Sequence, residues 1–164
     1  MPEGSLSTGI VGAGIGGLAL SILLRKADFD ITVFERSKHI SEFGAGVQLS
    51  PNGIKVIRQL GVEKQITKFA SCPERIVIRK AENNKVISKI PLGRVAAKRY
   101  AADFLQIHRV DLIDVLFNKA CELGVNFQFG REAIVKSVNK ESSLISCGEN
   151  KFKFDAVISA DGVH

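Results

Sequence analysis

The chain reads Gly12-Ala13-Gly14-Ile15-Gly16-Gly17 near its start, and this GxGxxG stretch decides the fold. Because the pattern alone is common, its meaning depends on the segments on either side of it. The apolar run at 6–11 predicts a short buried strand, in which Gly9 is a local weakness. The segment from Gly14 to about Lys26 predicts a helix. Three apolar side chains are expected on the inner face of this helix, Leu18, Ile22 and Leu23.

Each glycine of the stretch has a physical task. Gly12 permits the tight turn, Gly14 lets the backbone approach a pyrophosphate without a Cβ in the way, and Gly17 lets the helix pack close to the sheet. The N–H groups at the helix start, among them those of Ile15 and Gly16, have no partner within the helix. The positive end of the helix dipole lies there as well. An anionic diphosphate is therefore expected at this turn.

An acidic residue follows at the distance that such a site requires. After a turn at 28–30, residues 31–34 predict a second strand, which returns the chain toward the glycine turn and places Glu35 beside it. A carboxylate there accepts hydrogen bonds from ribose hydroxyls and repels a 2′-phosphate, which argues against NADP at this site. The next residue, Arg36, lies along the adenosine or is a plain surface charge. The sequence therefore predicts a Rossmann-like unit that binds the ADP half of a cofactor.

The rest of the chain predicts further helices, a hairpin and a meander. Helices are expected from Ser50-Pro51 to Gly61 and from about Arg109 to Leu123. Residues 76–79 and 85–90 suggest a β-hairpin. Four short strands suggest an antiparallel meander with a turn at 139–140, and they are 125–129, 133–139, 143–147 and 151–154. A last apolar strand is expected at 156–158. The fold class is therefore α/β, a Rossmann-like FAD/NAD(P)-binding fold with a parallel sheet plus an antiparallel β-meander.

Composition excludes several other classes of protein. The chain is 45% hydrophobic with a net charge of +6, but its Lys and Arg residues form no run longer than two. With one Tyr and no Trp, it lacks the footprint of a nucleic-acid-binding protein. The three cysteines fit neither a disulfide framework nor a zinc site, and no metal site is expected. The cysteines are expected to be reduced thiols in a cytoplasmic protein. The glycines that interrupt the first apolar stretch argue against a signal peptide or a membrane span.

Five segments carry a more specific resemblance. They are Ile10–Leu18, Val33–Arg36, Gly44–Gly53, Ile107–Leu112 and Asp155–His164, and the last contains the Asp-Gly pair of a DG motif. In this order they are similar to the N-terminal part of the class A FAD-dependent aromatic hydroxylases, the salicylate hydroxylase-like flavoprotein monooxygenases. The resemblance spans nearly all of the chain, and the combination is far more specific than the glycine stretch alone.

The resemblance implies further cofactor-binding residues. Arg109 matches an arginine that contacts FAD near its pyrophosphate and ribityl chain, and a cation at a helix start also suggests an anionic partner. Gly46 and Val47 lie in a segment that resembles the loop beside the isoalloxazine. Asp161 and Gly162 resemble the residues that link FAD binding to NAD(P)H binding. No residue of the chain is expected to be catalytic, since the flavin carries the chemistry.

The implied function is that of the FAD-binding part of an NAD(P)H-dependent monooxygenase. In that family NAD(P)H reduces FAD, dioxygen forms a flavin C4a-hydroperoxide, and a small aromatic substrate is hydroxylated. Family members are longer, so residues 1–164 are expected to be the N-terminal part of the FAD-binding domain. Residues 73–100 are then a hairpin excursion toward an incomplete substrate domain. Two alternatives stay open: another flavin oxidoreductase of the superfamily, an epoxidase or reductase, and a truncated non-catalytic nucleotide-binding protein.

Overall fold

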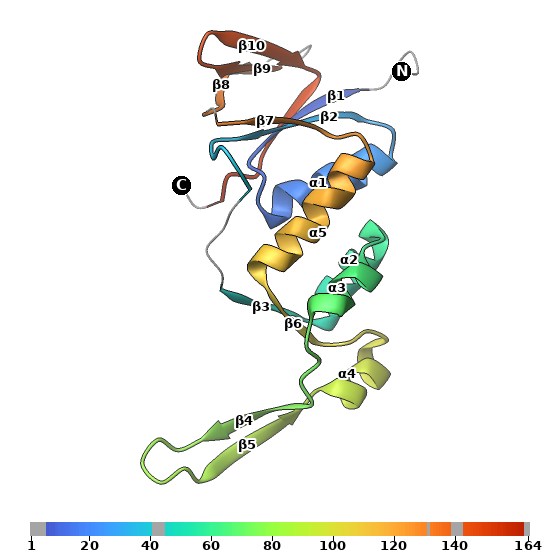
Figure 1. Cartoon of the computed structure of the whole chain (residues 1–164), viewed down its shortest axis with the longest axis vertical. Coiled ribbons are helices and arrows are strands. Elements are labelled where there is room, and N and C mark those ends of the chain that lie inside the picture. The colour runs from blue at the N-terminus through green and yellow to red at the C-terminus, as the bar shows by residue number, and fades with distance from the viewer. Residues whose placement is uncertain (1–5, 41–44, 131, 139–142, 163–164) are drawn as a thin grey trace. The chain divides into compact units, whose positions relative to one another are not determined.

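The computed structural model describes residues 6–40, 45–130, 132–138 and 143–162 (Figure 1). The chain divides into two compact units, one of Met1–Glu42 with Ile113–His164 and one of Phe43–Leu112. The elements follow in the order β1 (Ser7–Val11), α1 (Ile15–Lys26), β2 (Asp30–Glu35), β3 (Gly46–Leu49), α2 (Pro51–Leu60), α3 (Glu63–Phe69), β4 (Arg75–Arg79), β5 (Val86–Pro91), α4 (Gly93–Tyr100), β6 (Leu105–His108), α5 (Arg109–Glu122), β7 (Asn126–Phe129), β8 (Ile134–Val138), β9 (Ser143–Cys147), β10 (Asn150–Phe154) and β11 (Ala156–Ser159). The boundary between the units falls in the first turn of α5.

The first unit is built on a four-stranded parallel sheet in the order β11-β1-β2-β7. Ile10 on β1 pairs with Val33 on one side and with Ile158 on the other, and Val33 pairs in turn with Phe127. Because all three pairings are parallel, the carboxyl ends of the four strands lie at one edge of the sheet. The predicted α/β class and the predicted β1-α1-β2 unit are thereby confirmed.

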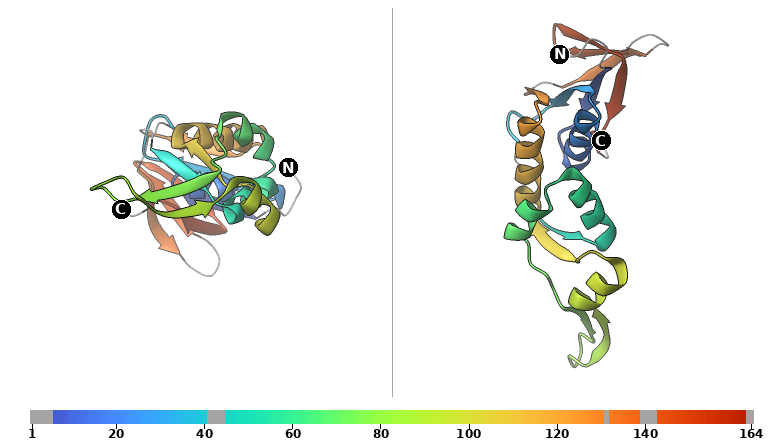
Figure 2. Two further views of the ribbon diagram at one scale, coloured as in Figure 1. Left: turned by 90° about the horizontal axis from the view of Figure 1, so that it is seen from below. Right: turned by 90° about the vertical axis from the view of Figure 1, so that its right-hand side faces the viewer.

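One face of this sheet packs on helices. Ile10 and Val33 from the strands, and Leu18 and Ile22 from α1, are fully buried as predicted. Leu23 is 37% exposed, so its predicted place on the inner face was wrong. Leu18 and Ile22 are four positions apart and share a stripe, whereas the next residue is rotated away from it. Figures 1 and 2 show α1 beside the part of α5 that belongs to this unit.

The other face of the sheet is covered by the three-stranded antiparallel sheet β10-β9-β8. Phe34 of β2 lies between the two sheets, with its ring edge-on to the rings of Phe152 and Phe154 at centroid distances of 5.2 and 5.8 Å. A Cβ on Gly9 would lie 2.8 Å from atoms of Ile145 and Phe154. Gly9, a weakness by strand propensity alone, therefore makes room for the side chains of the covering sheet.

The meander is smaller than the sequence predicts. Strands β8, β9 and β10 form it, and residues 148–150 turn the chain between β9 and β10. The turn predicted at 139–140 lies outside the described residues. Residues 125–129 were also assigned to the meander, but β7 pairs in parallel with β2, so that assignment was wrong. The reason is that α5 carries the chain back across the sheet before β7, and a strand after such a crossover adds in parallel.

The second unit contains the two-stranded sheets β3–β6 and β4–β5 and the helices α2, α3 and α4. Helix α2 has the predicted Pro51 in its first turn and ends at Gly61, whose φ of 80° is left-handed. Ser50 occupies the N-cap position, but its hydroxyl bonds to Asn52 instead of a helix N–H. The hairpin β4–β5 is also confirmed. Strands β3 and β6 and helices α3 and α4 were not predicted.

The described part of the chain contains neither a membrane-spanning helix nor a cluster of metal-binding side chains. No helix there is long and apolar enough to cross a membrane. Within the same residues, no group of three or more His, Cys, Asp and Glu side chains could hold a metal ion.

Candidate functional site

The turn after β1 has the geometry that the glycine stretch predicts. Gly12 has a φ of 105°, and a Cβ on it would lie 2.5 Å from the carbonyl oxygen of Ala160. Its N–H donates to the carbonyl of Phe34 at 2.7 Å, while the Ala160 N–H donates to the carbonyl of Val11 at 2.7 Å. The turn is therefore fixed against both neighbouring strands, and only glycine fits its backbone conformation without strain.

The other glycines of the stretch differ in what surrounds them. A Cβ on Gly17 would lie 1.9 Å from the carbonyl oxygen of Gly12, so glycine is required for the helix to start this close to the strand. Gly14 and Gly16 have no atom within 4 Å of the place a Cβ would take. The space beside Gly14 and Gly16 is thus open on the outside of the turn, where a ligand can approach the backbone.

The start of α1 supplies donors at this open space. Gly14 is the N-cap and makes no side-chain capping bond, and the first turn of the helix contains no acidic residue. The N–H groups of Ile15 and Gly16 belong to the first turn, which has no carbonyl partners within the helix. The free N–H donors, the positive end of the helix dipole and the absence of side chains at Gly14 and Gly16 together suit the binding of a diphosphate.

Glu35 lies beside the glycine turn, as its spacing predicts. Its Oε2 accepts a hydrogen bond from the Ala13 N–H at 2.9 Å, and its Oε1 accepts one from the Ser37 N–H at 2.9 Å. Partial burial acts to raise the pKa of Glu35. The bonds from Ser37 and Ala13, with the charge of Arg36, outweigh burial and hold the pKa below its usual value. The carboxylate is therefore ionised near neutral pH and keeps lone pairs for further donors.

A cavity of about 190 Å³ at the carboxyl ends of β1 and β2 brings several predicted residues together. It is lined by Val11, Gly12, Phe34, Arg36, Glu132, Ala133 and Asp161. The Ser159 hydroxyl bonds to the Asp161 carboxylate, and this bond, aided by the charge of Arg36, lowers the pKa of Asp161. Gly162, next in the chain, has a φ of 83°. Open α/β sheets bind ligands at this edge.

Sequence reasoning did not assign four of the lining residues to the site: Val11 and Phe34, which lie at the end of β1 and in β2, and, further along the chain, Glu132 and Ala133. Glu132 and Ala133 lie between β7 and β8 in a segment without regular structure, and no motif marks them. They reach the cavity because they directly precede β8, the first strand of the sheet that covers Phe34. This contact joins segments far apart in the sequence, so no local pattern could predict it.

The second unit brings together the remaining predicted residues. Gly46 and Val47 on β3 pair with His108 and Ile107 on β6. The backbone N–H of Arg109, directly after β6, donates to the carbonyl of Ala45 at 3.0 Å. Gly44, the first residue of the resembling segment, lies outside the described residues. A hollow of about 470 Å³ runs along this sheet and is lined by Gly46, Val47, Gln48, Phe69, Ser71, Gln106, Ile107 and His108.

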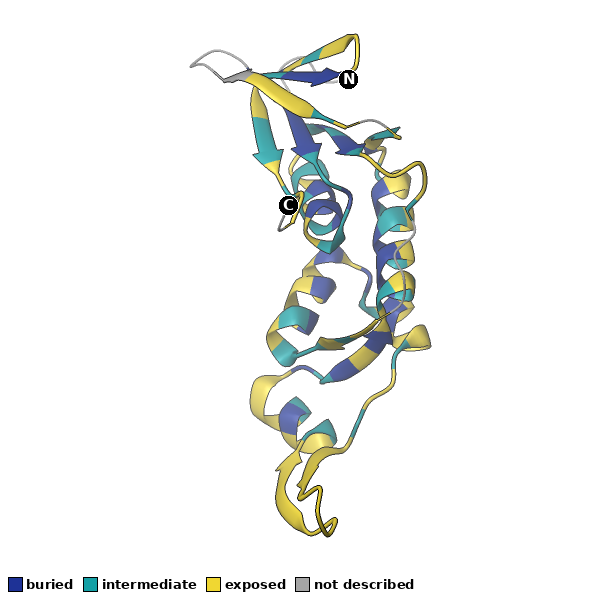
Figure 3. Ribbon diagram, turned by 90° about the vertical axis from the view of Figure 1, so that its left-hand side faces the viewer, coloured by how far each residue is buried: buried dark blue, intermediate teal, exposed yellow. Residues whose placement is uncertain are grey.

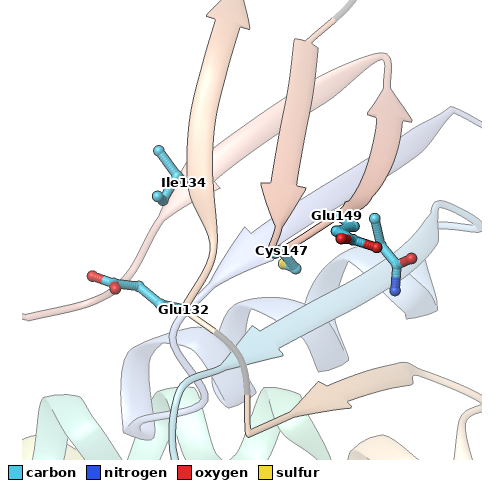
Figure 4. Close-up of a pocket in the computed structure, with 6 residues that line it drawn as sticks. Glu132, Ile134, Cys147 and Glu149 are labelled. Carbon is cyan, nitrogen blue, oxygen red and sulfur yellow. The ribbon is translucent and has the colours of Figure 1, made fainter.

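The first unit also has a larger hollow, of about 550 Å³, along the edge of the covering sheet (Figure 4). Its lining includes Glu132, Ile134, Cys147 and Glu149. None of the predicted cofactor-binding residues lines it, and it offers carboxylates where a diphosphate needs donors. Size therefore does not identify the site, whereas the chemistry of the glycine turn does.

Fold and site define a dinucleotide-binding domain of the flavoprotein type. The chain belongs to the family described as FAD binding domain, which it matches over residues 5–164. FAD is therefore the cofactor of this domain, and the donors and open glycines at the start of α1 fit its ADP half.

Relatives and solved structures agree with this membership. The chain is 29% identical to 6-hydroxynicotinate 3-monooxygenase of Bordetella bronchiseptica over 99% of its own length and 42% of the relative. It is 32% identical to 3-amino-4-hydroxybenzoate 2-monooxygenase of Streptomyces cremeus over its full length and 41% of the relative. A crystal structure of CtdE in complex with FAD and substrate 4 shares the fold, with a TM-score of 0.87, 22% identity, and coverage of 98% of this chain and 38% of that one. The chain thus spans about two-fifths of the length of these proteins.

Proposed function

We propose that this chain is the FAD-binding part of an NAD(P)H-dependent flavoprotein monooxygenase that hydroxylates a small aromatic substrate. The observation that carries the proposal is the family match over residues 5–164, combined with a glycine turn and Glu35 in the geometry of an ADP-binding site. The relatives point to the substrate class, because their names specify hydroxylated pyridine and benzene carboxylates. When bound, FAD supplies the redox chemistry that activates dioxygen.

The residues of the first unit bind the adenosine end of the cofactor. The N–H groups of Ile15 and Gly16 hold the pyrophosphate, and Gly14 allows it to approach the backbone. Glu35 accepts hydrogen bonds from the ribose hydroxyls through the lone pairs that Ala13 and Ser37 leave unused. Arg36 lies along the adenosine at the mouth of the 190 Å³ cavity.

Two further groups of residues act toward the flavin. Asp161 and Gly162, at the carboxyl end of the parallel sheet, connect FAD binding with NAD(P)H binding. In the second unit, Gly46 and Val47 offer backbone without bulky neighbours to the flavin ring, since nothing lies within 4 Å of a Cβ on Gly46. Arg109 supplies positive charge for the pyrophosphate and ribityl chain. Residues 73–100 are an excursion into the substrate region, and the cytoplasm is the proposed location.

Turnover tests the proposal. The full-length protein that contains residues 1–164 as its FAD-binding part is loaded with FAD and supplied with NADH or NADPH and with 6-hydroxynicotinate or 3-hydroxybenzoate under ¹⁸O₂, and products are analysed by mass spectrometry. Ring products that carry one ¹⁸O atom, together with nicotinamide oxidation, are expected. Bound FAD with neither nicotinamide oxidation nor labelled product in the full-length protein would contradict the monooxygenase assignment. Nicotinamide oxidation that is coupled to reduction or epoxidation of the substrate would favour another flavin oxidoreductase.

A further inference from the structure

The edge of the parallel sheet gives the direction in which the cofactor runs through the first unit. In the function proposed above, the pyrophosphate lies at the start of α1, directly after β1, and the ribose lies at Glu35, the last residue of β2. Strands β1 and β2 are mostly buried, as their dark blue and teal ribbons in Figure 3 show, so they hold these groups in a fixed frame. In the sheet order β11-β1-β2-β7, the step from pyrophosphate to ribose runs toward β7. The base is attached to the ribose opposite the phosphate and is therefore expected further in the same direction.

The segment that follows β7 lies where the base is expected. Strand β7 pairs with β2 up to the last residue of both strands, and beyond it the Gly130 N–H donates to the carbonyl of Ser37 at 3.0 Å. These contacts hold the chain after β7 beside the chain after β2. Ala133 packs against the apolar cluster around Phe34, which fixes the neighbouring backbone of Glu132 at the same edge of the sheet.

The cavity of about 190 Å³ connects this segment with the glycine turn. It reaches from Gly12 to Arg36 and Glu132. Pockets that hold a whole drug-sized ligand measure about 300–1,000 Å³, so this cavity suits one part of FAD and not the entire cofactor. Arg36 and Glu132 are the charged side chains on the β7 side of the cavity, whereas Asp161 follows β11 on the other side of β1. The planar guanidinium of an arginine can stack on an aromatic face, which suits a base beside Arg36.

Glu132 differs from the other carboxylates near this cavity. Glu35 and Asp161 accept hydrogen bonds from donors of the protein itself. Figure 4 shows the Glu132 side chain extending away from Cys147, another residue that lines the hollow of about 550 Å³. A carboxylate only accepts hydrogen bonds, so a group that Glu132 binds must be a donor. Adenine carries such a donor, the amino group on its C6 atom.

We infer that Glu132 recognises the 6-amino group of the adenine in FAD and is the residue that selects adenine at this end of the cofactor. The inference rests on the function proposed above, because it requires the ADP half of FAD at the glycine turn. The Glu132 carboxylate accepts a hydrogen bond from the amine while Arg36 covers a face of the ring. Guanine and hypoxanthine carry an oxygen acceptor at the same position, which a carboxylate repels.

A purely structural role for Glu132 makes a different prediction. An ion pair with Arg36 would also favour a carboxylate at this place. Removing such a pair would change the affinity for every dinucleotide by the same factor, whatever its base. Recognition of the amine instead changes the affinity for the adenine cofactor alone. The ratio of two affinities therefore separates the two roles.

Isothermal titration calorimetry with two cofactors tests the inference. The full-length protein that contains residues 1–164, freed of FAD, is titrated with FAD and with an analogue whose purine lacks the 6-amino group. The parent should bind FAD about tenfold more tightly than the analogue, the gain from one charge-assisted hydrogen bond. Glu132→Ala should reduce this preference to about twofold or less, and Glu132→Gln, which keeps a neutral acceptor, should retain about threefold. Glu149→Ala, the matched control in the larger hollow alone, should keep the parent's preference.

The other outcomes separate this inference from the function on which it rests. Equal binding of both cofactors by the parent, or an unchanged preference in Glu132→Ala, would overturn the inference and leave the FAD site intact. An equal loss of affinity for both cofactors in Glu132→Ala would assign Glu132 the structural role and overturn the inference as well. If neither cofactor binds to the folded parent, the proposed FAD site fails and the inference falls with it. Circular dichroism shows whether each variant keeps the fold.

Discussion

Gly14→Ala separates the binding role of the glycine turn from its folding role. Gly14 has φ −71° and ψ −176°, a conformation that alanine adopts readily, and no atom lies within 4 Å of the new Cβ. The free energy of unfolding should therefore stay the same or rise by up to about 1 kcal/mol, because alanine restricts the unfolded chain. A methyl group would nevertheless stand where the pyrophosphate must approach the backbone.

The loss of affinity follows from that steric conflict. Forcing one methyl group into a well-packed contact costs about 1–3 kcal/mol, which corresponds to about a 5- to 150-fold weaker Kd for FAD. Isothermal titration calorimetry measures the Kd, and urea denaturation measures stability. Gly53→Ala in α2, also with open space around its Cβ, is the matched control and should bind FAD like the parent. FAD binding by Gly14→Ala with an unchanged Kd would refute the assignment of this space to the pyrophosphate.

Three further predictions concern stability. Gly17→Ala should lower the free energy of unfolding by about 3 kcal/mol, because its Cβ would overlap the Gly12 carbonyl, and a parent-like urea midpoint would contradict this. Gly9→Ala should lower it by about 1–2 kcal/mol through contact with Ile145 and Phe154; an unchanged thermal midpoint in calorimetry would count against that packing. Hydrogen bonds from the Ser7 hydroxyl and N–H to the Asp155 carboxylate lower the pKa of Asp155 in the folded protein. The stability that these bonds provide is therefore fully present above the pKa of about 4 that Asp has in the unfolded chain, and it is lost as the pH falls below that value. Urea midpoints of Asp155→Asn between pH 6 and about pH 3 should therefore decline less than those of the parent, and parallel curves would contradict the linkage.

The glycine turn could be predicted because its requirements are local. A strand, Gly12, the start of α1 and Glu35 all lie within one β-α-β unit, and their spacing is set by helix rise and strand length. The placement of Glu35 beside the turn, with its Oε2 2.9 Å from the Ala13 nitrogen, follows from those lengths. The same locality explains why α2, with proline at its start and glycine at its end, was predicted with nearly its observed bounds.

Features that depend on distant partners could not be predicted. Residues 126–129 have the composition of any short strand, and only the crossover through α5 decides that they join β2 in parallel. Strand β3 is four residues long and is stabilised by pairing with β6, some 60 residues later in the chain. Glu132 and Ala133 reach the cavity for the same reason. Family resemblance supplied Arg109 and Asp161, whose roles toward the cofactor remain predictions.

A titration of the 164-residue chain with FAD, with AMP and FMN as controls, tests the central claim most directly. FAD and AMP both contain adenosine phosphate, whereas FMN contains the flavin without it. The glycine turn and Glu35 predict saturable binding of FAD and AMP and little binding of FMN. Binding of FMN without AMP, or no binding of FAD by a sample whose circular dichroism shows that it is folded, would contradict an adenosine site at this turn.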